Sequence, residues 1–166
     1  MSPLKPKMTP EEFFPYVLAA AQKTQATSGI PASFTMAQAA VESAWNGSGL
    51  SQQDYNFFGI KAIGGWSGPT QTWPTREFLQ GHYVTIEAPF RKYASMEEGF
   101  ADHAAFLTGN ARYRGAFLHT GDGVAFAQAV QAAGYATDPH YAEVIVGIIG
   151  AHGLGRFDVS GAPLGA

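Results

Sequence analysis

The only β-like stretch of the chain lies between two blocks of helical pattern. Residues 70–79 and 82–86 are predicted strands, and Gln80-Gly81 between them is typical of a tight hairpin turn. Pro74 lies inside the first strand, where its missing N–H favours a sheet edge or a bend. The pattern predicts a mostly helical domain with one small β-hairpin, in the α+β class.

Capping signals mark the starts of two helices. Thr9 and Glu12 form a capping box ahead of a helix that is expected to reach residue 28, and Ser95 and Glu98 form another ahead of a helix to about residue 107. Apolar residues at helical spacing predict further helices over residues 33–45, 123–133 and 137–152, while residues 51–69 are expected to be irregular.

The length of 166 residues suits one domain. We expect a flexible leader over residues 1–8, a folded domain over 9–154 and a flexible Gly/Pro/Ala tail over 155–166. No apolar run is long enough for a membrane span, and residues 1–21 do not have the pattern of a secretory signal.

The amino-acid composition argues against several classes of function. A net charge of −3, with charged residues at 14%, argues against a nucleic-acid partner. The absence of cysteine excludes thiol catalysis and Cys-based metal sites, and the five histidines show no metal-ligand spacing. We therefore expect no metal and no cofactor. Recognition is expected to depend on aromatic and neutral hydrogen-bonding groups.

Glu42 is the first candidate for chemistry. It lies beside the apolar stripe of the predicted helix 33–45, about 100° round the axis from Val41, and in the last turn. The negative end of the helix dipole and the apolar neighbours both disfavour an ionised carboxylate, so its pKa should rise, as a general acid requires. The alternative is an ordinary solvated helix glutamate.

Glu77, in the first strand of the predicted hairpin, is the second candidate. A bent edge strand can hold it across a groove from Glu42, and two carboxylates flanking a glycosidic bond are the general requirement for acid/base hydrolysis. The alternative is a solvent-facing residue that pairs with Arg76 or His82.

Two aromatic residues lie outside regular elements. Trp66 is in a glycine-rich segment, and Tyr135 follows the helix stop at Gly134. A loop aromatic with polar neighbours can stack on the apolar face of a sugar ring. The alternative is that each ring folds back onto the core.

Several segments, in register, resemble glycoside hydrolase family seventy-three, the β-N-acetylglucosaminidases. Residues 39–45 read Ala-Ala-Val-Glu-Ser-Ala-Trp, residues 55–62 read Tyr-Asn-Phe-Phe-Gly-Ile-Lys-Ala, and residues 134–142 read Gly-Tyr-Ala-Thr-Asp-Pro-His-Tyr-Ala. Shorter matches occur at residues 66–69, 75–78, 90–95 and 112–113. The likeness extends from about residue 10 to 152.

The resemblance implies a lysozyme-like fold, with a helical lobe, a β-hairpin lobe and a groove between them. It implies hydrolysis of the GlcNAc-β-1,4-MurNAc bond of peptidoglycan glycan strands. Glu42 then matches the general acid, Glu77 the base or the stabiliser of positive charge, and Tyr135 an active-site tyrosine. His103 departs from the family, which commonly has tyrosine there. The expected substrate-binding residues are Asn56, Phe57, Trp66, Asp102 and Tyr113.

Other functions remain open at this point. A muramidase or a lytic transglycosylase uses a helix-borne glutamate on a similar fold, and a catalytically silent wall-binding module is a third possibility. We expect a monomer that acts in the periplasm or the cell wall. Without a signal peptide, its delivery would be by holin release or specialised secretion, or the chain would be an excised domain.

Overall fold

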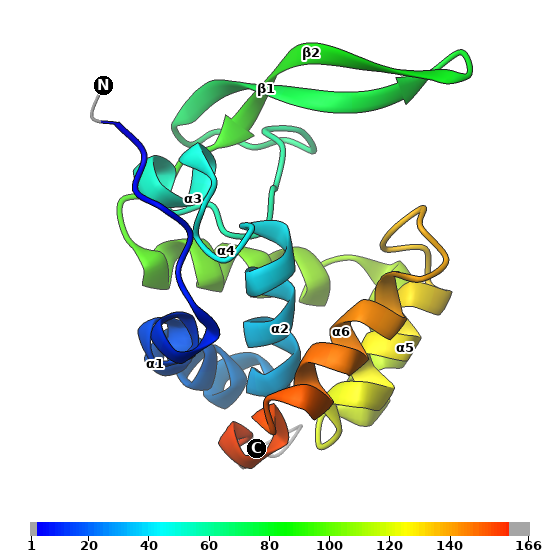
Figure 1. Ribbon diagram of the computed structural model, residues 1–166. Coiled ribbons are helices and arrows are strands. Elements are labelled where there is room, and N and C mark those ends of the chain that lie inside the picture. The colour runs from blue at the N-terminus through cyan, green and yellow to red at the C-terminus, as the bar shows by residue number, and fades with distance from the viewer. Residues whose placement is uncertain (1–2, 160–166) are drawn as a thin grey trace.

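A computed structural model describes residues 3–159 of the chain. Helices gather in one lobe, and a long hairpin extends from the top of that lobe as an arm (Figure 1). In chain order the elements are α1 (Pro10–Ser28), α2 (Ala32–Glu42), α3 (Gly49–Asp54), β1 (Thr70–Leu79), β2 (His82–Arg91), α4 (Met96–Thr108), the 3₁₀ helix η1 (Ala111–His119), α5 (Gly123–Ala132), α6 (Tyr141–Ala151) and the 3₁₀ helix η2 (Leu154–Phe157). The mostly helical α+β prediction is confirmed.

Helix α2 is the centre of the helical lobe. Every residue from Ala32 to Ala40 is buried, and α1, α5, α6 and η2 pack around it. A helix that is apolar on all sides must be enclosed, and here Phe34 meets Phe126 with ring centroids 4.8 Å apart. The C-terminal end of this helix, at Glu42, is thereby held rigidly at the edge of the lobe.

The predicted caps are confirmed. The Thr9 side chain accepts a hydrogen bond from the Glu12 N–H in a complete capping box, and Gly29 ends α1 with φ 82°. The Ser95 side chain accepts from the Glu98 N–H at the start of α4. These short sequence signals are reliable because each satisfies backbone donors that the helix itself leaves unpaired.

Some helix boundaries were predicted wrongly. The helix expected over residues 33–45 ends at Glu42, because Ala44, Trp45 and Asn46 take positive φ angles of 50°, 57° and 60°. The segment expected to be irregular begins with α3, which Ser48 caps, and η1 was not predicted. Short helices carry too few apolar repeats to be recognised by periodicity.

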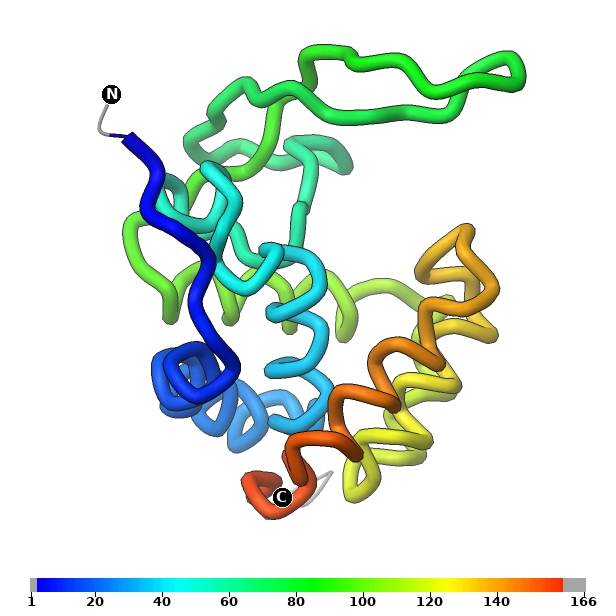
Figure 2. Tube along the Cα trace, viewed as in Figure 1, coloured from blue at the N-terminus to red at the C-terminus, as the bar shows by residue number. Residues whose placement is uncertain are grey.

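The hairpin is paired along its whole length, from Thr70 opposite Arg91 to Leu79 opposite His82. The second strand is therefore longer than expected. At the base of the hairpin Ala88 and Phe90 are buried, whereas near the tip Phe78 and Tyr83 are 61% and 64% exposed. The chain between α3 and β1 runs from the helical lobe up to this base (Figure 2). The hairpin is thus buried at its base and exposed at its tip.

Hydrogen bonds join both ends of the described chain to the helical lobe. Before α1, the N–H of Lys5 donates to the Gln52 side chain and that of Met8 to the Trp45 carbonyl. After η2, Asp158 accepts bonds from both the N–H and the hydroxyl of Ser33, at 2.7 and 2.9 Å.

The contact at Ser33 has a physical reason. Pro31 at the start of α2 offers no side-chain cap, so the Asp158 carboxylate supplies the missing acceptor from the expected tail. The rest of that tail, residues 160–166, lies outside the described residues. Within residues 3–159, no helix combines the length and the apolar character that crossing a membrane requires.

Candidate active site

A pocket of about 300 Å³ lies between the helical lobe and the base of the hairpin. The end of α2, the loop before β1, the end of β2, α4, η1 and the loop after α5 each contribute to its wall. The lining residues are Glu42, Phe58, Gly59, Ile60, Lys61, Ile63, Arg91, Phe106, Tyr113 and Tyr135. Residues from both lobes therefore form the predicted groove.

Glu42 is the last residue of α2 and faces this pocket. Its side chain keeps surface open to the pocket. The protein packed around it nevertheless withholds much of the water that would stabilise a charge, and this desolvation raises the pKa of its carboxyl. The Tyr141 hydroxyl opposes the rise in the pKa of Glu42 in part. The expectation of a raised pKa at Glu42 is met, with burial as the leading cause.

A glycine brings the loop backbone close to the Glu42 carboxyl. A Cβ atom on Gly59 would lie 3.9 Å from Glu42 Oε2, and Gly59 has φ +66°, which other residues rarely adopt. The buried side-chain amide of Asn56 shapes this loop: it bonds the N–H and the carbonyl of Ile60 and the carbonyl of Arg91. The side-chain amide of Asn56, an expected substrate-binding residue, therefore binds backbone atoms.

Three tyrosines form a cluster beside Glu42. The rings of Tyr113 and Tyr135 lie 5.9 Å apart, and those of Tyr135 and Tyr141 are stacked at 5.7 Å. Burial, with the nearby Glu42 charge, raises the pKa of Tyr135 well above its ordinary value, so its hydroxyl remains a donor. Tyr113 and Tyr135 line the pocket where the sequence placed them. Tyr141 was not singled out, because its position in an apolar stripe of α6 indicated core packing only.

Glu77 does not line the pocket with Glu42. Its carboxylate pairs with the Lys61 ammonium, Oε1 to Nζ, at 2.5 Å, and its side chain is 30% exposed. It lies opposite Val84 on the partly buried face of the hairpin. Lys61 itself lines the pocket together with Glu42. Lys61 was not among the predicted site residues, although it lies inside the matched segment 55–62.

Arg91, at the end of β2, holds the wall of the pocket together. Its guanidinium donates to the carbonyls of Lys61 and Ile63 and to the Asp102 carboxylate. The same guanidinium lies 4.8 Å from the Trp66 ring centroid. Asp102 and Trp66, both expected to bind substrate, are therefore placed around Arg91, outside the lining of the pocket.

Phe57 and His103 belong to the core. The ring of Phe57 contacts those of Phe13 and Phe100. His103 is fully buried and stacks on Phe58 with centroids 3.7 Å apart. Neither of its ring nitrogens has a hydrogen-bond partner among residues 3–159. Burial lowers the pKa of His103 to about 3, so it is neutral.

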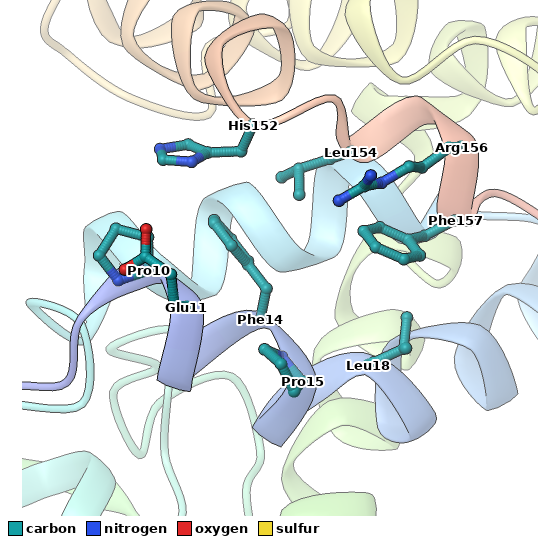
Figure 3. A pocket seen from close by; sticks show the side chains of 9 residues that line it. All are labelled: Pro10, Glu11, Phe14, Pro15, Leu18, His152, Leu154, Arg156 and Phe157. Carbon is teal, nitrogen blue, oxygen red and sulfur yellow. The ribbon is translucent and has the colours of Figure 1, made fainter.

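A larger pocket, about 440 Å³, lies between the start of α1 and the segment after α6 (Figure 3). Phe14, Leu18, Leu154 and Phe157 make most of its wall apolar, and Glu11 is its one carboxylate. Its chemistry is less suited to acid catalysis than that of the pocket at Glu42. In the described part of the chain, no three His, Asp or Glu side chains are grouped to hold a metal ion.

Several known proteins are similar in sequence to this chain. The chain is 40% identical to the peptidoglycan hydrolase FlgJ of Pseudomonas aeruginosa over 142 residues, which is 83% of this chain and 36% of FlgJ. It is 39% identical to the exo-glucosaminidase LytG of Bacillus subtilis over 130 residues, 76% of this chain and 45% of LytG. The chain thus spans less than half the length of these relatives.

Solved structures show the same fold. The catalytic domain of the autolysin Auto from Listeria monocytogenes superposes with a TM-score of 0.79 at 30% identity, covering 91% of this chain and 90% of that one. The glycoside hydrolase domain of FlgJ from Salmonella typhimurium gives 0.71 at 33% identity, covering 88% and 89%. Residues 18–154 match the family Glucosaminidase, described as mannosyl-glycoprotein endo-beta-N-acetylglucosaminidase. With 137 of its 166 residues inside that match and a lysozyme-like fold in common, the chain belongs to the glucosaminidase family of glycoside hydrolases.

Proposed function

We propose that this chain is an endo-β-N-acetylglucosaminidase that hydrolyses the GlcNAc-β-1,4-MurNAc bond of peptidoglycan, in the periplasm or the cell wall. One observation carries the proposal: the Glu42 carboxyl, with a raised pKa, opens into a pocket between the two lobes. Membership of the glucosaminidase family and relatives named as peptidoglycan hydrolases supply the substrate class.

Glu42 acts as the general acid in this proposal. Breakage of a glycosidic bond needs a proton on the leaving oxygen while positive charge develops on the sugar ring. A carboxyl that stays protonated near neutral pH supplies that proton. Glu42 ends a helix whose residues from Ala32 to Ala40 are all buried, which fixes the position of the proton relative to the bound glycan.

Glu77 positions or activates the attacking water, or stabilises the positive charge. Its ion pair with Lys61 ties the carboxylate to the loop that forms one wall of the pocket. Because Glu77 does not line the pocket, it approaches the sugar only when the hairpin moves. The hairpin, which is anchored at its base and exposed at its tip, has the freedom for such a movement.

The remaining predicted site residues take two kinds of role. Tyr113 and Tyr135, which line the pocket, contact the sugar through their rings and hydroxyls. Asn56, Asp102 and Trp66 support the backbone and the Arg91 side chain that form the wall. Phe57 supports the same wall from the core.

Analysis of the new reducing ends tests the bond assignment. Purified sacculi are digested with the protein, reduced with borohydride and hydrolysed, and the reduced sugars are identified. We expect reduced N-acetylglucosamine ends. Reduced muramic acid would instead indicate a muramidase, and anhydromuramic acid a lytic transglycosylase. The absence of any digestion would indicate a silent wall-binding module.

A further inference from the structure

Helix α3 lies beneath the base of the hairpin (Figure 1), and Trp73 of β1 joins the two. The indole Nε1 of Trp73 donates a hydrogen bond to Asp54 Oδ2 at 2.6 Å. Asp54 is the last residue of α3 and is 2% exposed. Because a buried carboxylate must be hydrogen-bonded to offset its lost hydration, this bond holds the first strand firmly to α3.

A glycine leaves room for the Trp73 ring. A Cβ atom on Gly49, the first residue of α3, would lie 2.5 Å from two carbon atoms of that ring, which is far inside van der Waals contact. Gly49 does not have the positive φ angle that would itself require glycine. Its missing side chain therefore serves the close approach of the indole. The ring lies against the start of α3, and its N–H reaches the end of the same helix.

The second strand is held by the same short segment of chain. Asn56, two residues after Asp54, donates its side-chain amide to the carbonyl of Arg91 at 2.9 Å. The N–H of Tyr93, just after β2, donates to the Asp54 carbonyl at 2.9 Å. Residues 54–56 thus hold both strands at the base of the hairpin.

Trp73 and Glu77 lie on one face of β1. Side chains alternate along a strand, so residues 73, 75 and 77 point the same way, and each is partly buried while the residues between them are exposed. Glu77 is four residues nearer the tip, about 13 Å farther along the strand at the usual rise. A small rotation of β1 about the Trp73 contact is therefore enlarged at the Glu77 carboxylate.

We propose that Trp73, seated on Gly49 and bonded to Asp54, is the pivot of the hairpin and sets where Glu77 meets a glycan bound at Glu42. Trp73 does not line the pocket at Glu42, so it is a positioning residue that acts through Glu77. The inference rests on the proposed function. It deepens that function by naming the contact that fixes the base of the movable hairpin.

Two variants change the pivot in different ways. Trp73→Phe keeps an aromatic ring but loses the N–H, and Gly49→Ala keeps the N–H but adds a methyl group that collides with the ring. Gly147→Ala on α6 is the matched control, because beyond its own helix backbone and chain neighbours a Cβ there has no atom of residues 3–159 within 4 Å. Asp54→Asn, the conservative variant, keeps an oxygen that can accept the indole N–H. Thermal unfolding first shows that each variant is folded.

The position of the hairpin is measured directly. The chain has no cysteine, so Thr85→Cys on β2 and Gln128→Cys on α5, both at exposed positions, provide two unique sites for spin labels. Double electron–electron resonance gives the distribution of distances between the labels. We expect this distribution to shift or broaden in both pivot variants and to match the parent protein in the conservative and control variants.

The rate on sacculi separates positioning from general damage. At a saturating sacculus concentration we expect Trp73→Phe and Gly49→Ala each to lose about tenfold in kcat, at a nearly unchanged half-saturating concentration. In a Glu77→Gln background the same changes should cost little more, because they act through that carboxylate. Asp54→Asn should keep most of the activity, and Gly147→Ala all of it.

Unchanged label distances in Trp73→Phe or in Gly49→Ala would overturn the inference. Losses of kcat that multiply fully with the loss in Glu77→Gln would overturn it too, because the pivot would then act on something other than Glu77. Failure of the proposed function looks different. A Glu42→Gln enzyme with wild-type activity would exclude Glu42 as the acid, yet the label distances would still show whether Trp73 positions the hairpin.

Discussion

The two candidate carboxylates are held in contrasting ways. Glu42 ends a helix that is buried from Ala32 to Ala40, and its side chain opens into the pocket. Glu77 is on a hairpin that is buried at its base and exposed at its tip, and one ion pair to Lys61 ties it to the loop before β1. One carboxylate is therefore fixed by the core, and the other is adjustable.

This contrast fits different catalytic roles for Glu42 and Glu77. Protonation of a leaving oxygen requires precise placement and a raised pKa, and a rigid helix end provides both. Positioning of water or support of a developing charge can wait until substrate has bound, so a movable arm is sufficient. Each of the following predictions tests one side of the contrast.

The largest effect is expected for Glu42→Gln. The amide cannot supply the acid proton, so hydrolysis of sacculi should fall by about a thousandfold, within the range for loss of a general acid. Reducing-end release at a saturating sacculus concentration measures it. Glu97→Gln, an exposed change on α4, is the control and should keep full activity. A Glu42→Gln enzyme with wild-type activity would show that Glu42 is not the general acid.

A smaller loss, about a hundredfold, is expected for Glu77→Gln, because water can still enter an open groove without a positioned carboxylate. The same reducing-end assay measures it. Glu87→Gln is a matched control on the same hairpin: Glu87 is exposed and pairs with Pro74 on the adjacent strand. Equal activities of the two variants would show that Glu77 is an ordinary strand residue.

Loss of the Lys61 ammonium should cost about tenfold in kcat, since Glu77 keeps its carboxylate but loses the partner that holds it near the pocket. Lys61→Met is compared with Lys61→Arg, which can remake the ion pair. We expect the arginine variant to recover part of the activity. A Lys61→Met enzyme with wild-type kcat would mean that the ion pair does not position the hairpin.

The smallest effect at neutral pH concerns the buried His103. Its folded-state pKa of about 3 is below the ordinary 6.5, so the unfolded chain takes up a proton that the folded one rejects. The free energy of unfolding should therefore fall as the pH drops from 6.5 towards 3, with a slope from this residue of up to about 1.4 kcal/mol per pH unit. Denaturant titrations at several pH values should show a shallower slope in His103→Phe. An unchanged slope would mean that His103 is not buried in its neutral form.

Much of the architecture was predictable because local chemistry determines it. Thr9, Ser95 and the Gln80-Gly81 turn mark their elements by caps and turn geometry that need no distant partner. The raised pKa of Glu42 was predictable for a similar reason, since its position at a helix end and its apolar neighbours are visible in the sequence.

The unpredicted features depend on contacts between distant segments. Asn56 looked like a groove residue, but its amide bonds the backbone at Ile60 and Arg91. The hydroxyl of Tyr141 is bonded by the buried Gln38 amide, and Glu77 pairs with Lys61, which lines the pocket in its place. Hydrophobic periodicity predicts which residues are buried, but it does not predict the hydrogen-bond partners of a buried polar group.

The most direct measurement compares Glu42→Gln with the wild type on two leaving groups. A natural glycan bond needs a proton on its leaving oxygen, whereas an aryl chitooligosaccharide with a good phenolate leaving group does not. We expect the thousandfold loss on the glycan to shrink to within about tenfold on the aryl substrate. Equal losses on both substrates would contradict the assignment of Glu42 as the general acid.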